Sequence, residues 1–279
     1  MNKFSAIVEI SRPVNVVITF ITIVLAGIIC SVPKSLNENI WLAAVSGMFV
    51  TAAGNIINDY FDVKIDRINK PERVLPAGKL SPNSALLLYI LFSIIALLLS
   101  AEINLSAFLI VVFACLMLFL YSYKLKKIIL MGNLTVAFFT GLAFIFGGLA
   151  VGNWQAGIFP ALFAFFVNLI REIVKDAEDV KGDKMAGVIT LPQKYKTEKV
   201  IFILITLTVL LIVLTTFPFF LKIYNIEYFI IVMIVVNVLF VYFIREIKNN
   251  FSMQNLKRMS SLLKLNMILG LISIFIGSF

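Results

Sequence analysis

Two short segments of the chain hold all six of its aspartates, at matching positions. NDYFDVKID covers residues 58–66 and KDAEDVKGD covers residues 175–183. Both contain the pattern D-x-x-D-x-x-x-D, in which Asp59, Asp62 and Asp66 recur 117 positions later as Asp176, Asp179 and Asp183. Two solvated acidic loops are the alternative interpretation. The matched spacing instead favours a shared chemical task for the two segments.

The chemistry that this spacing favours is binding of a divalent cation. If each segment continues a helix, positions i, i+3 and i+7 fall on one face, where three carboxylates repel one another unless a cation is present. Mg²⁺ prefers such oxygen ligands and binds through one or two carboxylates, several waters and substrate phosphates. We therefore expect two Mg²⁺ ions with a diphosphate between them. The expected metal-binding residues are Asn58, Asp59, Asp62, Asp66, Asp176, Asp179 and Asp183.

Basic and amide side chains around the two segments suit phosphate oxygens, which Arg binds in a bidentate manner. Lys and Arg also accumulate on the cytoplasmic side of membrane proteins, so both interpretations stay open for a single lysine. Arg67 and Arg73 lie in the same stretch between hydrophobic runs as the first Asp segment, and Arg12 lies at the entrance of the first hydrophobic run. On these grounds, the residues expected to contact substrate are Arg12, Asn15, Asn55, Arg67, Lys70, Arg73, Lys124, Lys126, Arg171 and Lys175.

The rest of the chain has the composition of an integral membrane protein. Of its 279 residues, 61% are hydrophobic and 14% are charged, whereas a soluble domain keeps roughly a quarter of its residues charged. It has no histidine, which removes the commonest general base and a usual zinc ligand. Cys30 and Cys115 both lie in apolar runs, without the spacing of metal ligands.

Nine apolar runs are long enough to cross a bilayer, which takes about 18 residues. They cover residues 13–32, 38–57, 83–101, 104–121, 130–151, 154–174, 198–221, 226–244 and 261–278. With the N-terminus inside, 22 of the 24 Lys and Arg residues are cytoplasmic. This predicts an all-α, multi-pass protein of the cell membrane with a cytoplasmic N-terminus and active site. It also accounts for the net charge of +9 without nucleic acid.

Four of these runs separate the two Asp segments, so the two halves have parallel topology. We expect one membrane-embedded domain over residues 1–279, built as a duplicated four-helix unit (about 1–125 and 126–250) plus one extra helix. Loops 58–82 and 171–197 would cover the site, and a Leu-Pro pair follows each Asp segment, at residues 75–76 and 191–192. A transporter is disfavoured because the runs hold almost no ionisable residues near their centres.

At these residues the chain resembles the UbiA-type intramembrane prenyltransferases. Asn58, Asp62 and Asp66 match the family motif N-x-x-x-D-x-x-x-D, and Asp179 and Asp183 match its D-x-x-x-D. The stretch R-x-x-K-P-x-R-x-x-P-x-G at residues 67–78 matches as well. So does the stretch between the fourth and fifth runs, which adds Tyr121 and Asn133 to the expected substrate-binding residues, beside Lys126.

The resemblance implies Mg²⁺-dependent prenyl transfer, in which the diphosphate of a prenyl donor leaves and an acceptor attacks the allylic cation. The implied catalytic residues are Asp62, Asp66, Asp179 and Asp183. The sequence REIVKDAEDVKGDKMAG is most similar to the archaeal branch of the family. That branch transfers the geranylgeranyl group of geranylgeranyl diphosphate to a lipid-like geranylgeranylglyceryl phosphate and releases diphosphate. Prenylation of an aromatic acceptor, as in quinone biosynthesis, is the alternative.

Overall fold

The computed structural model describes residues 3–180, 182 and 187–279, and every regular element in these ranges is a helix. Nine helical segments there are long and apolar enough to cross a membrane. The predicted all-α fold with nine spans is therefore confirmed. The spans are Pro13–Cys30, Glu38–Asn69, Pro82–Ala101, Leu105–Tyr123, Met131–Ala150, Trp154–Glu178, Thr197–Phe220, Ile226–Asn249 and Met253–Gly277.

The longest helix, α3 (Glu38–Asn69), continues well beyond the second predicted run. Asn37 caps its start, because the side-chain oxygen accepts a hydrogen bond from the backbone N–H of Ile40 at 3.0 Å. The helix ends directly before Lys70, which precedes Pro71 and is therefore disfavoured in helical conformation. Residues 58–69, predicted to begin a loop, are thus helical. Residues 171–178 differ from the predicted loop in the same way, since they belong to α7 (Ile158–Glu178).

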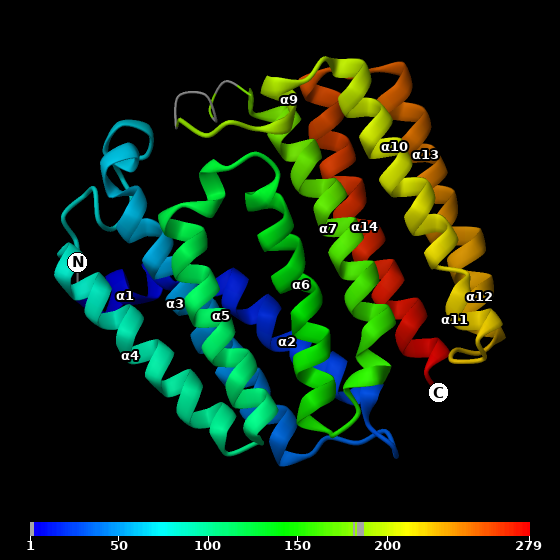
Figure 1. Ribbon diagram of the computed structural model, residues 1–279, viewed down its shortest axis with the longest axis horizontal. Coiled ribbons are helices and arrows are strands. Elements are labelled where there is room, and N and C mark those ends of the chain that lie inside the picture. Colours follow the sequence, from blue (N-terminus) through cyan, green and yellow to red (C-terminus); the bar gives the residue numbers. More distant parts are fainter. Residues whose placement is uncertain (1–2, 181, 183–186) are drawn as a thin grey trace. The chain divides into compact units, whose positions relative to one another are not determined.

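The described chain forms two compact units. Unit 1 comprises residues 1–125 and 143–157. It contains α1 (Lys3–Ser11), α2 (Pro13–Cys30), α3, α4 (Pro82–Ala101), α5 (Leu105–Tyr123), the second half of α6 (Met131–Ala150) and the short helix η2 (Trp154–Gly157). Helix α3 packs against α1, α2, α4 and α5 (Figure 1). The helix that carries the first Asp segment is therefore the central helix of unit 1.

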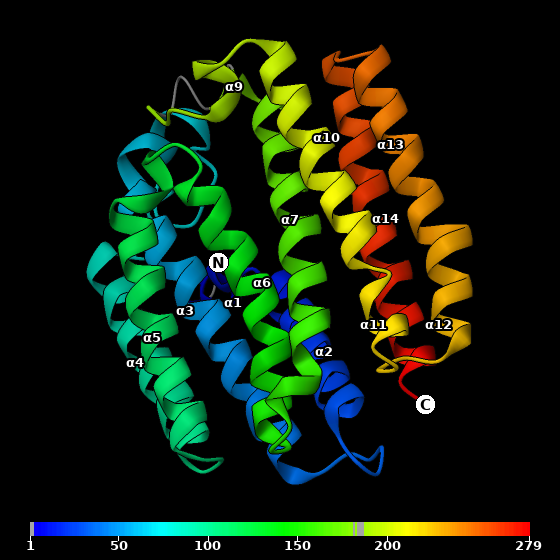
Figure 2. The ribbon, with the colours of Figure 1, turned by 45° about the vertical axis from the view of Figure 1, so that its right-hand side comes forward.

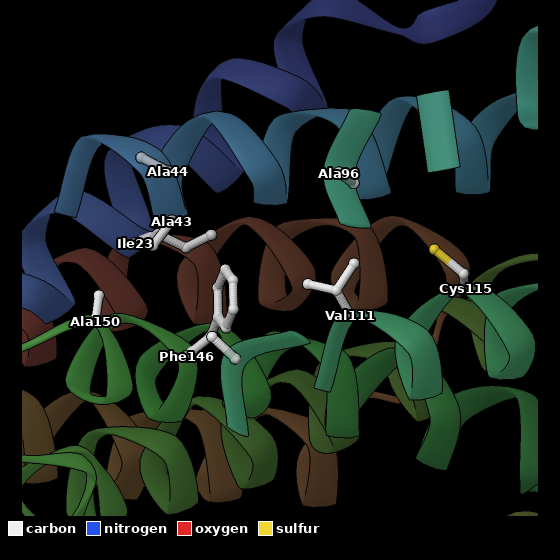
Figure 3. Packing of buried hydrophobic residues seen from close by; sticks show 9 residues of the cluster. Ile23, Ala43, Ala44, Ala96, Val111, Cys115, Phe146 and Ala150 are labelled. Carbon is white, nitrogen blue, oxygen red and sulfur yellow. The ribbon is translucent and has the colours of Figure 1, made fainter. Parts of the chain in front are cut away.

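Small side chains let the helices of unit 1 approach closely. Figure 3 shows Ala43 and Ala44 of α3 and Ala96 of α4 in one buried cluster with Phe146 and Ala150 of α6. Contacts of this kind place residues 143–157 in unit 1, although they lie in the second of the two predicted repeat halves. The repeat boundaries themselves stay a prediction.

Unit 2 comprises residues 126–142 and 158–279. Its helices α7, α10 (Thr197–Leu214), α13 (Asn237–Asn249) and α14 (Met253–Gly277) lie side by side (Figure 2). Shorter elements connect them: α9 (Leu191–Lys194), α11 (Phe217–Phe220), α12 (Ile226–Ile231) and the π-helical turn η3 (Val232–Val236). Helix α7, which carries Asp176 in its last turn, packs against α9, α10 and α14.

Gly147 of α6 tests the packing of unit 1. A Cβ atom there would lie 2.6 Å from the Cβ of Ala26 and 2.8 Å from the carbonyl oxygen of Ile23, so helix α2 would have to move. We expect Gly147→Ala to lower the free energy of unfolding by about 1–3 kcal/mol, as overpacking does. Gly270→Ala is the control, because its Cβ would meet nothing within 4 Å. Thermal unfolding in detergent measures both variants, and equal midpoints would contradict the close contact.

Candidate active site

The first Asp segment carries two buried carboxylates that share one arginine. The side chains of Asp59 and Asp66 are 8% and 7% exposed. Nη1 of Arg73 donates to Oδ2 of Asp66 at 2.8 Å and lies 3.5 Å from Oδ1 of Asp59. Nη2 of Arg12 donates to the same Oδ1 of Asp59 at 2.5 Å. The two aspartates therefore lie on one face of α3, as their spacing predicts, and two guanidinium groups offset their charge.

Arg12 reaches Asp59 from the junction between α1 and α2. Its backbone adopts a left-handed conformation with φ of 54°, which is uncommon for a residue with a side chain. The side-chain amide of Asn55, one turn before Asp59 on α3, donates to the carbonyl oxygen of Ser11 at 2.9 Å. Asn55, predicted to contact substrate, thus holds the α1–α2 junction against α3.

Arg73 is positioned by apolar residues on the segment that follows α3. Val74, Leu75 and Leu80 are buried in one cluster with Ile10 of α1 and Ile56 of α3. Lys79 of the same segment forms an ion pair with Glu9 of α1 at 2.9 Å. Leu75, the first residue of the Leu-Pro pair, is therefore an anchor that folds this segment back and brings the neighbouring Arg73 to the carboxylates.

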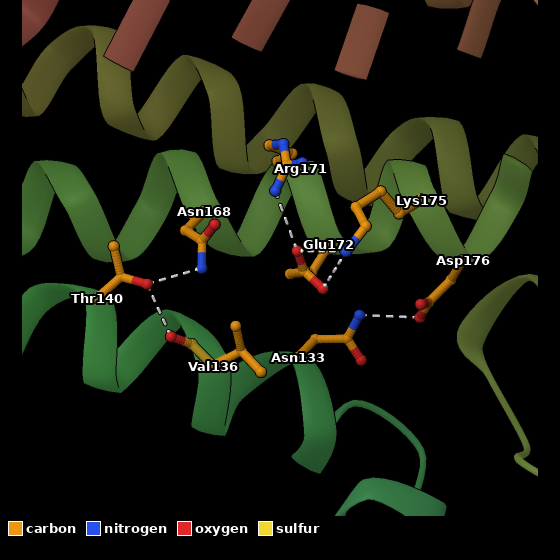
Figure 4. Close-up of polar contacts among 8 residues, drawn as sticks. All are labelled: Asn133, Val136, Thr140, Asn168, Arg171, Glu172, Lys175 and Asp176. Atoms are coloured by element: carbon orange, nitrogen blue, oxygen red, sulfur yellow. Dashed lines mark hydrogen bonds and ion pairs between the residues drawn. The ribbon is translucent and has the colours of Figure 1, made fainter. Parts of the chain in front are cut away.

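The second Asp segment lies at the end of α7 in unit 2. The side-chain amide of Asn133, in the first turn of α6, donates to Oδ2 of Asp176 at 2.8 Å (Figure 4). Beyond the helix end, Oδ1 of the exposed Asp179 accepts a hydrogen bond from the backbone N–H of Gly182 at 3.1 Å. Asp183, predicted as a metal ligand, lies outside the described residues.

A row of polar side chains runs along α7 before Asp176 (Figure 4). Oε1 of Glu172 pairs with Nζ of Lys175 at 2.9 Å and with Nη1 of Arg171 at 3.3 Å. One turn earlier, the amide of the buried Asn168 donates to the hydroxyl of Thr140 on α6 at 2.9 Å. Asn168 is not among the residues that the sequence predicts to be functional. The signal for it is the spacing of four that separates residues 168, 172 and 176.

The other residues predicted to bind metal or substrate differ in their exposure to solvent. Arg67 and Lys70 are exposed at the end of α3, Lys124 is exposed at the end of α5, and Asn15 is exposed in the first turn of α2. Partly buried positions are occupied by Asn58 and Asp62 on α3, Tyr121 on α5 and Lys126 in the turn η1 (Leu125–Lys127). The structure thus brings Arg12 and Arg73 to the first segment and Asn133 to the second.

The oxygen donors fit Mg²⁺ bound together with a phosphate ligand. In the ranges that the structure describes, no three His, Cys, Asp or Glu side chains gather in a way that could hold an ion by themselves. In unit 1, arginines already supply the positive charge that the crowded carboxylates require. Mg²⁺ needs only one or two protein carboxylates when waters and substrate phosphates complete its shell. Asp62, Asp66 and Asp179 provide carboxylates of this kind.

Comparisons with known proteins identify the family. The model of the UbiA prenyltransferase family matches residues 19–268. The chain is 39% identical to the digeranylgeranylglyceryl phosphate synthase of Methanobrevibacter smithii over 280 residues, which is 98% of this chain and 97% of that protein. It is 34% identical to the synthase of the same name from Methanosphaera stadtmanae over 271 residues, 97% of this chain and 98% of that protein.

Solved structures share the fold. A structure of digeranylgeranylglyceryl phosphate synthase has a TM-score of 0.87 and 36% identity, and the match covers 100% of this chain and 99% of that chain. A UbiA homologue from Archaeoglobus fulgidus bound to GPP and Mg²⁺ has a TM-score of 0.71 and 22% identity, over 96% of this chain and 99% of that chain. At that identity the second likeness supports the fold alone.

The shared arginine of unit 1 leads to a stability prediction. Arg73→Gln removes the cation that Asp59 and Asp66 have in common and leaves buried charge uncompensated. We expect the free energy of unfolding to fall by roughly 3 kcal/mol in Mg²⁺-free buffer, as when one partner of a buried ion pair is removed. Arg67→Gln, a change at an exposed position near the end of α3, should cost less than about 0.5 kcal/mol. Thermal unfolding compares them, and equal small shifts would contradict the charge compensation.

Proposed function

Since the chain belongs to the UbiA prenyltransferase family, we propose that it transfers a geranylgeranyl group from geranylgeranyl diphosphate to geranylgeranylglyceryl phosphate. The products are digeranylgeranylglyceryl phosphate and diphosphate, so the reaction forms the second ether bond of an archaeal membrane lipid. The observation that carries the proposal is the pair of matched Asp segments, one at the end of α3 and one that begins in the last turn of α7. Each provides oxygen ligands beside basic side chains, as a diphosphate substrate requires.

The bond changes define what the site must do. The bond between C1 of the prenyl chain and the diphosphate oxygen breaks, and its electron pair leaves with the diphosphate. The hydroxyl oxygen of the glyceryl phosphate forms the new bond to C1 and releases its proton. Negative charge therefore develops on the leaving diphosphate, and groups that stabilise this charge accelerate the step. The chain has no histidine, and the reaction needs charge neutralisation at the leaving group more than a proton donor.

In this proposal, carboxylates of both Asp segments bind the metal. Bound Mg²⁺ supplies Lewis-acid stabilisation of the diphosphate charge. The residues that would hold it are Asp62, Asp66, Asp179 and Asp183, two from each segment, which suits two ions. Arg73 lies beside Asp66, at 2.8 Å, so the same part of the chain offers a cation to the phosphate oxygens.

Basic residues near the Asp segments would bind the phosphates of the two substrates. Arg67 and Lys70 are exposed directly after the last aspartate on α3, where the phosphate group of a lipid substrate can reach them. Lys175 and Arg171 flank Glu172 on α7, which keeps their charged ends close together. Asn15, Tyr121, Lys124 and Lys126 complete the proposed set of substrate contacts.

We place the reaction at the cytoplasmic face of the cell membrane. The support for this orientation is the distribution of positive charge, since 22 of the 24 Lys and Arg residues fall on one side of the predicted topology. Both Asp segments lie on that side. The prenyl chains of both substrates would extend among the apolar helices and the surrounding lipid, while their phosphates stay with the basic residues at the helix ends.

A panel of acceptors tests the proposed function. Purified protein in lipid receives radiolabelled geranylgeranyl diphosphate, Mg²⁺ and one acceptor: geranylgeranylglyceryl phosphate, geranylgeranylglycerol, hydroxybenzoate or naphthoate. We expect transfer to the glyceryl phosphate to exceed transfer to every other acceptor by roughly 100-fold or more, because the basic residues assigned to the acceptor phosphate have no partner when that phosphate is missing.

Each other outcome of the panel has a definite meaning. Preferred prenylation of an aromatic acceptor would replace the proposal with a role in quinone biosynthesis. Equal transfer to geranylgeranylglycerol would contradict the assignment of basic residues to the acceptor phosphate. An absence of labelled product and of diphosphate release with all four acceptors would contradict prenyl transfer altogether.

A further inference from the structure

The first aspartate of each triplet is set apart from the other two. Asp59 and Asp176 stand outside the N-x-x-x-D-x-x-x-D and D-x-x-x-D motifs, which Asp62, Asp66, Asp179 and Asp183 satisfy. The spacing alone predicts that all three aspartates of a triplet bind metal. In the described residues, the first aspartate of each triplet has a polar partner from the start of the preceding helix.

Asp59 is enclosed by guanidinium groups. Its side chain is 8% exposed, and one of its oxygens, Oδ1, lies 2.5 Å from Nη2 of Arg12 and 3.5 Å from Nη1 of Arg73. A metal ion at this carboxylate would have to displace Arg12 or lie against its positive charge. Like charges at such a distance repel strongly in a site with little water. The geometry therefore favours Asp59 as a partner of arginine.

Asp176 makes the corresponding contact in unit 2. Its Oδ2 accepts a hydrogen bond from the side-chain amide of Asn133 at 2.8 Å. Asn133 is the third residue of α6, and Arg12 directly precedes Pro13, the first residue of α2. In both units, then, the first aspartate binds a polar side chain from the start of the helix that comes before its own. The contact recurs together with the sequence repeat.

We propose that Asp59 and Asp176 are positioning residues that fix the preceding helix and orient Arg12, Arg73 and Asn133, and that they are not metal ligands. This inference rests on the proposed function and divides the work within each triplet. In this proposal Asp59 stays paired with Arg73. Asp66, at 2.8 Å from the same guanidinium, can give up its contact with Arg73 and bind a metal ion instead. Arg12 and Arg73 then stay beside the metal-bound diphosphate with their charges partly compensated.

A charge-balanced double variant separates positioning from metal binding. Purified full-length protein is titrated with Mn²⁺ alone, and free Mn²⁺ is followed by electron paramagnetic resonance. Arg12→Gln with Asp59→Asn removes one charge of each sign, so we expect the Mn²⁺ Kd to stay within about three-fold of the wild type. Asp62→Asn should raise that Kd about ten-fold or more. Loss of a metal ligand lowers metal affinity at least as much as loss of a residue that only hydrogen-bonds to a ligand.

Unit 2 offers an independent version of the same comparison. Asp176→Asn keeps an oxygen that can accept the hydrogen bond from Asn133 and removes the charge that a metal ligand would use. We expect a Mn²⁺ Kd within about three-fold of the wild type, while Asp179→Asn raises it about ten-fold. Because this variant keeps the shape and the hydrogen bond of the native residue, it provides a result even if the changes at Asp59 prevent folding.

Kinetics with geranylgeranyl diphosphate distinguish positioning from mere structural support. Asp59→Asn alone should raise KM about ten-fold with a smaller change in kcat, because the arginines that hold the ground-state diphosphate lose their orientation. In a protein that already carries Arg12→Gln and Arg73→Gln, the same change should have little further effect on KM. An equal additional rise in that background would overturn a role through the arginines.

Two results would overturn the inference about the metal. The first is loss of Mn²⁺ affinity in the Asp59 double variant to the extent seen with Asp62→Asn, and the second is the same loss in Asp176→Asn. Failure of the proposed function would look different, since a wild-type protein that prenylates no glyceryl phosphate can still show the expected order of Mn²⁺ affinities.

Discussion

Buried carboxylates at the end of a membrane helix require positive charge beside them, and the structure around the first Asp segment follows from this requirement. Asp59 and Asp66 are nearly inaccessible to water, so their charge must be compensated within the protein. Arg12 compensates it from the α1–α2 junction and Arg73 from the segment after α3. The left-handed backbone of Arg12, the apolar anchor at Leu75 and the ion pair of Lys79 with Glu9 all hold these two arginines in place.

The same requirement connects structure to catalysis. A site that binds a metal and a diphosphate must keep its carboxylates charged before substrate arrives, without letting their repulsion distort the helix. Arginines meet this need, and they are also suitable ligands for phosphate. In unit 2, Asp176 accepts an amide hydrogen bond from Asn133, and the exposed Asp179 accepts one from the backbone N–H of Gly182.

Local patterns in the sequence predict much of this structure, because hydrophobic length and helical spacing are local properties. They predict the nine spans, and they predict that Asp59 and Asp66 share a face of α3. They do not predict which distant residue meets which carboxylate. Arg12 contacts an aspartate 47 positions away and Asn133 one 43 positions away, and these pairings depend on how helices pack. The role of Leu75 is not predictable from the sequence for the same reason, since Leu75 is buried only because its segment folds back onto α1 and α3.

The central claim is that prenyl transfer depends on a divalent metal held by the carboxylates of the two Asp segments. The direct measurement is release of diphosphate and transfer of label from geranylgeranyl diphosphate to geranylgeranylglyceryl phosphate, with Mg²⁺ and in excess EDTA. We expect both signals to vanish with the chelator and to return when Mg²⁺ or Mn²⁺ is added back, because the clusters provide hard oxygen ligands and the leaving group needs neutralisation. Full transfer in excess EDTA would contradict the account.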